Sequence, residues 1–175
     1  VLAKISEPDA AGFIEHKIVG AGELVRADLI VQALNFSRCE IDALDARWWR
    51  GRTQHDDGNT ALTLITTGGD PDSDELSGPM RPTPALGQCP YLMQVLDALG
   101  ATWGRARLMR LSGQAEVRAH VDMNYYWRER MRVHVPVVTT PSVRFQCGDG
   151  EVNMAAGECW VFDTWRRHRV LNQGN

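Results

Sequence analysis

The stretch RAHVDMNYYWRERMRVHVPVV (118–138) sets imidazole, carboxylate and guanidinium groups at alternate positions among valines. Alternation of apolar and polar residues is typical of a β-strand with one buried face. Successive side chains of a strand point to opposite faces, so His120 and Asp122 would share a face with Glu116. The pattern therefore predicts a strand that presents an imidazole and a carboxylate side by side.

The same spacing recurs further along this stretch. Arg132 and His134 are also two residues apart, and we expect them to share a face of a second strand. Pro136 follows in MRVHVPVVT (131–139), and a proline inside a strand pattern predicts a sheet edge or a bend.

From residue 105 onward the chain is rich in short strand patterns. The candidates are RARLMRL (105–111), EVRAHVD (116–122), MRVHVPVVT (131–139), VRFQC (143–147), ECWVFD (158–163) and HRVLN (168–172). Turn-forming residues such as SGQ (112–114) and GDG (148–150) separate most of them. Closely spaced short strands with turn signals predict a jelly-roll-like sandwich or barrel.

The first hundred residues mix helix and strand patterns. GELVRADLIVQALNFS (22–37) has helical apolar spacing, and CPYLMQVLDALG (89–100) has a proline near its start and a glycine at its end. TALTLITTGGD (60–70) predicts a strand ending at a Gly-Gly turn, and the Pro- and Gly-rich segment 71–88 predicts an irregular loop. We expect one domain over 1–175, with a helical portion at about 1–100 packed on a β-rich core at about 60–175.

Composition excludes several classes of protein. The net charge of −3 argues against a nucleic-acid protein, and no apolar run is long enough to span a bilayer. The first residues lack the apolar segment of a secretion signal, which predicts a cytoplasmic protein without a membrane partner. The four cysteines form no C-x-x-C pair and have no zinc-ribbon spacing, which favours buried reduced thiols over a disulfide or a catalytic thiol.

A second histidine near His120 and Asp122 would complete a metal site. The candidates are His16, His134 and His168. Two imidazoles and one carboxylate can occupy one face of an octahedron and leave the other face open for substrates, as in non-haem Fe(II) oxygenases. A second His-x-Asp pair begins at His55, but its polar turn context predicts solvated side chains.

Three segments carry a resemblance to a known family: HVD (120–122), RVHVPVVTTPSVRF (132–145) and GECWVFDTWRRHRVLN (157–172). Together they resemble the aspartyl/asparaginyl β-hydroxylase family, which includes bacterial hydroxylases of free proline. Its members are Fe(II)- and 2-oxoglutarate-dependent dioxygenases with a double-stranded β-helix fold, a jelly-roll variant. The resemblance implies Fe(II), 2-oxoglutarate and O2 as cofactor and co-substrates, and an amino acid, free or within a peptide, as substrate.

The resemblance also assigns roles to residues of this chain. It implies that His120, Asp122 and His168 are the iron ligands. The family's Arg-x-His pair matches Arg132 and His134, which implies contact with a carboxylate of 2-oxoglutarate or of the substrate.

The family also has an arginine on the strand after the distal histidine, which binds the far carboxylate of 2-oxoglutarate. The family places this arginine about ten residues after the distal histidine, and Asn175 is only seven residues after His168. We therefore expect a basic residue beyond Asn175, with Arg107 and Arg110, or Arg169, as substitutes within the chain.

Two alternatives stay open at the level of sequence. One is another metal-dependent jelly-roll enzyme, such as a cupin-like isomerase or hydrolase, in which zinc would favour a closed tetrahedral site. The other is a non-catalytic jelly-roll module in which the histidines are structural. Nothing in the sequence indicates the oligomeric state or the identity of the substrate.

Overall fold

The computed structural model describes residues 14–16, 37–51, 56–130 and 132–174. The described residues form mainly antiparallel strands, with few helices, in a β-rich jelly-roll-like arrangement, as the sequence predicts. No helix among them is long and apolar enough to cross a membrane. That the entire chain is one domain stays a prediction.

The described strands fall in two groups along the chain. Those before residue 121 are β1 (Ile14–His16), β2 (Arg50–Gly51), β3 (Asp56–Thr67), β4 (Met80–Pro82) and β5 (Ala106–His120). Those after it are β6 (Arg132–His134), β7 (Val143–Cys147), β8 (Gly150–Val152), β9 (Trp160–Phe162) and β10 (His168–Asn172). The helices are α2 (Pro84–Gly87) and α3 (Pro90–Ala98), the 3-10 turns η1 (Ala46–Trp48) and η2 (Tyr125–Glu129), and residues 37–43.

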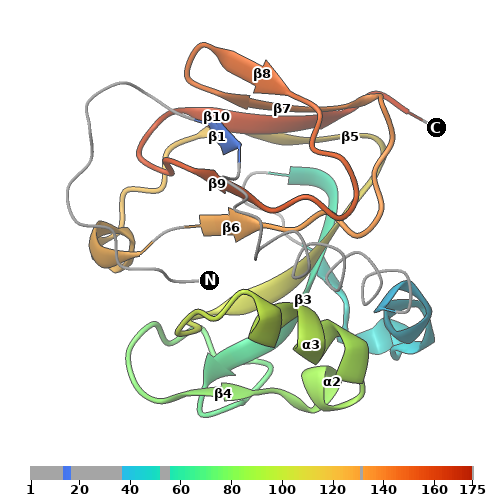
Figure 1. The fold of residues 1–175 in the computed structure, drawn as a ribbon, viewed down its shortest axis with the longest axis vertical. Coiled ribbons are helices and arrows are strands. Elements are labelled where there is room, and N and C mark those ends of the chain that lie inside the picture. The colour runs from blue at the N-terminus through green and yellow to red at the C-terminus, as the bar shows by residue number, and fades with distance from the viewer. Residues whose placement is uncertain (1–13, 17–36, 52–55, 131, 175) are drawn as a thin grey trace.

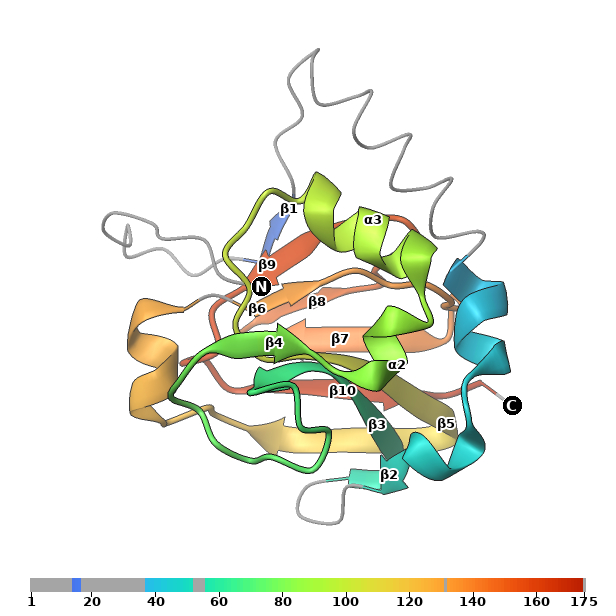
Figure 2. The same cartoon turned by 90° about the horizontal axis from the view of Figure 1, so that it is seen from below.

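Two sheets make up the described structure. The large sheet has the order β2-β3-β5-β10-β7-β8, with β4 paired to β3, and the small sheet has the order β1-β9-β6. Figure 1 shows the small sheet below the β7–β10 part of the large sheet, and the two overlap in the view of Figure 2. They therefore stack face to face, and Phe145 of β7 packs on Phe162 of β9 between them with ring centroids 4.6 Å apart.

Strand β5 is a single long strand where the sequence predicts two strands and a turn. It runs through the SGQ residues because β3 pairs with it on both sides of them, and a register shift takes up the irregularity. Gln114 has a φ of 60°, and Gly58 opposite has a φ of 77°. A Cβ at Gly58 would lie 2.8 Å from Cβ of Ala115, so the strands approach this closely only because residue 58 is glycine. The predicted turn is wrong, and a bulge takes its place.

A second register shift reverses one predicted face of β5. His120 pairs with His168, whereas Val117 pairs with Val170, so one extra residue of β5 lies between these pairs. Glu116 pairs with Leu171 and therefore faces away from His120. The expectation that Glu116 and His120 share a face is wrong, because the extra residue of a bulge breaks the alternation of side chains along the strand.

The remaining segments agree with the predictions in part. The predicted helix at 89–100 is present as α3, and Gly100 follows it with a φ of 61°. The predicted loop at 71–88 contains β4 and α2 in its second half, and the predicted strand at 131–139 ends at His134, two residues before Pro136. Of the predicted helix at 22–37, residues 22–36 lie outside the described residues.

The two larger apolar clusters among the described residues stabilise the fold. The first lies where α2 and α3 cover β3; its buried members are Leu44, Leu62, Leu64, Ile65, Ala85, Leu86, Cys89 and Leu92. Trp48 and Trp49 pack against it. The second lies between the two sheets and comprises Phe145, Cys147, Met154, Trp160 and Phe162. All four cysteines are free.

Candidate metal centre

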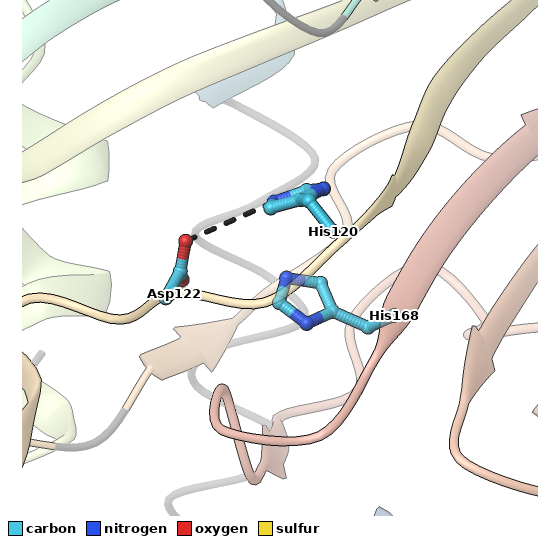
Figure 3. Close-up of side chains that lie close together, drawn as sticks. All are labelled: His120, Asp122 and His168. Atoms are coloured by element: carbon cyan, nitrogen blue, oxygen red, sulfur yellow. Dashed lines mark ion pairs between the residues drawn. The ribbon is translucent and has the colours of Figure 1, made fainter.

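The end of β5 and the start of β10 bring two histidines and an aspartate together. His120 and His168 are direct partners in the antiparallel pair, so their side chains project from the same face of the sheet. Asp122 follows β5 closely, and Figure 3 shows its carboxylate turned toward both rings. One ligand atom from each of the three residues lies within 4.8 Å of the others.

Both histidines are oriented by backbone carbonyl groups. Nδ1 of His120 lies 2.7 Å from the carbonyl oxygen of Arg118, and Nδ1 of His168 lies 2.8 Å from that of Arg166. A carbonyl oxygen can only accept, so each Nδ1 carries the proton and donates it. The lone pair is then on Nε2 in both rings, the tautomer that a metal requires.

The Nε2 atom of His168 is buried without a partner. The residue is 3% exposed, and this nitrogen accepts no hydrogen bond from the described residues. A buried acceptor left unsatisfied costs free energy and is uncommon in folded proteins. A metal ion would satisfy it, so the donor set fits the metal implied by the sequence.

Asp122 is fixed from both its backbone and its side chain. Its amide donates to the carbonyl of Thr164 (3.0 Å), which ties it to the turn that precedes β10. Oδ1 lies 3.8 Å from Nε2 of His120, and Oδ2 lies 2.7 Å from Nη2 of Arg132. The second contact is an ion pair without the alignment of a hydrogen bond. The guanidinium compensates the charge of the Asp122 carboxylate, whose side chain is only 15% exposed.

An aromatic wall backs the metal ligands. The ring of His168 lies 5.1 Å from that of Phe162, and the ring of His134 lies 5.0 Å from the same phenylalanine on another side. Burial, reinforced by the Arg132 cation, lowers the pKa of His134 to about 3. Burial also lowers the pKa of His168, against the opposing effect of its bond to the Arg166 carbonyl. Both rings are therefore neutral at neutral pH, and neutral imidazole is the form that ligates metals.

The structure brings Arg132 to the candidate metal centre but not Arg107 or Arg110. Arg132 contacts Asp122 directly, and His134 lies on the same strand behind it. A strand rises ~3.3 Å per residue, which puts Arg110 on the order of 30 Å from His120 along β5 and Arg107 further still. Arg110 instead stacks on Trp49 at 4.1 Å. Trp49 packs against the apolar cluster under α2 and α3, so Arg110 lies at that end of β5, and binding of 2-oxoglutarate by Arg107 or Arg110 stays a prediction.

The other sequence candidates lie elsewhere. Arg169 follows His168 in β10, so its side chain projects from the opposite face, where Nε donates to Oε1 of Gln146 (2.5 Å). His16 pairs through its backbone with Trp160 of β9, and His55 lies outside the described residues. Asp57 of the second His-x-Asp pair lies in β3 and pairs with Glu116 of β5, so the turn predicted there is wrong for the described part of that segment.

Sequence reasoning missed the groups that orient the ligands. The acceptors for Nδ1 are backbone carbonyls, which every residue has, so no side-chain pattern could reveal them. The stacking of Arg132 on Trp127 was also missed, although an aromatic residue five positions before an arginine is visible in the sequence. That spacing becomes meaningful only because η2 turns the chain back before β6 begins.

The comparison with protein families agrees with this geometry. A model of the aspartyl/asparaginyl beta-hydroxylase family matches residues 38–175. The match covers most of the chain, and the protein therefore belongs to this family of hydroxylases. A search of curated proteins found no match.

Proposed function

We propose that this protein is an Fe(II)- and 2-oxoglutarate-dependent dioxygenase that hydroxylates an amino acid, free or within a peptide. The observation that carries the proposal is that ligand atoms of two imidazoles and a carboxylate lie within 4.8 Å of one another. Nε2 of His168, one of these atoms, is a buried acceptor without a partner among the described residues. Membership in a hydroxylase family supports the reaction type. The cytoplasmic location expected from the sequence remains part of the proposal.

In this proposal three side chains hold the metal: His120, Asp122 and His168. Bound Fe(II), together with 2-oxoglutarate and O2, supplies the oxidising chemistry that inserts oxygen into a C–H bond. The protein's own contribution is to present both imidazoles in one tautomer and to hold the Asp122 carboxylate beside Arg132. The aromatic wall formed by Phe145 and Phe162 limits access of water behind the ligands.

Arg132 and His134 are proposed to bind a carboxylate of the co-substrate or substrate. The Arg132 guanidinium has five N–H donors, and its contact with Asp122 uses one edge of the fork. The His134 ring is neutral and keeps a polar donor close to the ligands without adding a second positive charge. A planar fork beside a metal suits bidentate recognition of a carboxylate.

Turnover measured by mass spectrometry tests the proposal. Protein loaded with Fe(II) is supplied with 2-oxoglutarate, O2 and a panel of amino acids and short peptides. We expect one substrate to gain a single oxygen atom in step with formation of succinate, and His168→Ala to form neither product. Metal binding without any consumption of 2-oxoglutarate would instead favour a cupin-like isomerase or hydrolase.

A further inference from the structure

The segment YYWRERMR (125–132) pairs each of three consecutive aromatic rings with one of three alternate arginines. The pairs are Tyr125 with Arg128 (4.4 Å), Tyr126 with Arg130 (4.0 Å) and Trp127 with Arg132 (4.2 Å), measured from Cζ to the ring centroid. The three aromatic residues and Arg128 lie on the tight turn η2, whereas Arg130 follows it directly and Arg132 begins β6. Of these three guanidinium groups, Arg132 has the ion pair with Asp122.

Arg132 is held on two sides at once. The Trp127 ring contacts the face of its guanidinium, while Nη2 meets Oδ2 of Asp122 at 2.7 Å. An arginine side chain has many rotamers in solution, and a flat contact on an aromatic ring removes most of them without consuming the N–H donors at its rim. Indole is the ring that attracts cations most strongly.

Trp127 is itself anchored to the segment that carries the second histidine. Trp165, three residues before His168, donates from Nε1 to the carbonyl oxygen of Trp127 at 3.5 Å. The ring of Tyr126 meets that of Trp127 edge-on, with centroids 5.2 Å apart and an interplanar angle of 88°. The backbone of Trp127 is thus tied to the segment that leads to His168, and its indole ring packs against Tyr126.

We infer that Trp127 is a positioning residue that holds Arg132 ready to bind a carboxylate at the candidate metal centre. The inference rests on the proposed function, in which Arg132 is the carboxylate-binding cation. Trp127 thus raises the affinity for 2-oxoglutarate or for an acidic group of the substrate, and it does so only through Arg132. A tryptophan that served packing alone would change stability and leave this affinity unaltered in the folded protein.

Calorimetric titration of 2-oxoglutarate into the anaerobic Mn(II)-loaded protein measures this effect. A stacked cation of this kind is worth about 1 kcal/mol, so we expect Trp127→Leu to weaken binding about fivefold and Trp127→Phe to recover part of the loss. Arg132→Lys should weaken binding at least as much, and Trp127→Leu combined with Arg132→Lys should be no weaker than Arg132→Lys alone. Independent, additive losses, or unchanged affinity in Trp127→Leu, would overturn the assignment.

Tyr125→Leu is the matched control. It removes the equivalent ring from Arg128, but Tyr125 is 78% exposed. Its affinity for 2-oxoglutarate should equal that of the unaltered protein, and a loss as large as that of Trp127→Leu would overturn a specific role for Trp127. Mn(II) affinity, followed by electron paramagnetic resonance, should be the same in both leucine variants.

A second measurement needs neither metal nor co-substrate. In 15N-labelled protein the Nε–Hε resonance of Arg132, identified by its loss in Arg132→Lys, should be displaced by the ring current of Trp127. Trp127→Leu should return it toward the position of a free arginine, and an unmoved resonance would overturn the inference. If the Mn(II)-loaded protein binds no 2-oxoglutarate at all, the proposed function fails, while this resonance still decides whether Trp127 holds Arg132.

Discussion

The two ends of β5 are built from the same strand geometry but lie in different surroundings. Near its start, Leu108 pairs with Leu62 of β3, which is 1% exposed under the helices α2 and α3. At its end, His120 pairs with His168, whose buried Nε2 has no partner among the described residues. Figure 1 shows the two ends in separate halves of the fold, joined by β5 itself.

The contrast separates residues that stabilise the fold from residues that do chemistry. At the start of β5, burial of apolar surface stabilises the folded state. At its end, burial of an unsatisfied imidazole and an ionised carboxylate costs free energy, which is typical of functional sites. Substitutions at the two ends should therefore alter different measured quantities.

The largest effect is expected from His168→Ala. The variant should lose metal affinity by more than about a hundredfold, since a ligand matters more than an outer-shell partner. Its free energy of unfolding without metal should fall less than that of Leu62→Ala, because removal of an unsatisfied buried atom offsets part of the cost of the cavity. Thermal unfolding with and without Fe(II) checks both: the rise in Tm on adding metal should vanish. A full rise in Tm would show that His168 is not a ligand.

Leu62→Ala should have the converse effect at the other end of β5. Removing a leucine side chain that is 99% buried by its neighbours leaves a cavity, and we expect the free energy of unfolding to fall by about 3 kcal/mol. Denaturant titration measures the loss. Metal affinity of the folded variant should stay within about twofold, and a much larger drop would mean that the two ends are coupled.

Gly58→Ala tests the bulge that lies between the two ends. The left-handed φ of 77° and the predicted approach of a new Cβ to Ala115 (2.8 Å) should lower the free energy of unfolding by about 2 kcal/mol. Ser112→Ala, which removes the hydrogen bond to the Gly58 carbonyl, is a milder control on the same bulge. Equal, negligible losses in both would show that the strands tolerate a side chain there.

The buried thiol of Cys89, in the apolar cluster under α2 and α3, should make the free energy of unfolding depend on pH. Burial raises the pKa of its thiol from 9.0 to about 11, with Glu40 adding to the shift. As the pH rises, the thiol therefore loses its proton in the unfolded state before it does so in the folded state. The stability of the folded state is greatest below pH 9 and falls as the pH rises toward 11. Unfolding free energies across this range should fall less steeply in Cys89→Ala, whereas an identical slope would contradict the shift.

The smallest effect is expected from His55→Ala. Asp57 of the His55 pair lies in β3 opposite Glu116, and His120, Asp122 and His168 already form a complete ligand set. Calorimetric titration of Fe(II) should give the same affinity and stoichiometry as the unaltered chain. A lost site in this variant would move the metal to the other His-x-Asp pair.

The sequence predicted the β-rich class of the fold because apolar and polar residues alternate wherever one face of a strand is buried. It failed at SGQ (112–114) and at Glu116, because bulges depend on the register of neighbouring strands rather than on local residue type. Pairing of His120 with His168 could be anticipated only through the family resemblance, since these residues are far apart in the sequence. The distances that place Arg110 away from the ligands follow from β5 being one long strand, which the turn-like residues concealed.

Long-range 1H–15N NMR of the histidines, with and without one equivalent of Zn(II) as a diamagnetic probe, tests the central claim most directly. We predict that His120 and His168 bind through Nε2 while each Nδ1 keeps its proton, because both Nδ1 atoms donate to backbone carbonyls. His134 should stay neutral and unligated, since burial and Arg132 already lower its pKa. Unchanged Nε2 resonances in His120 and His168, or ligation through Nδ1, would contradict the account.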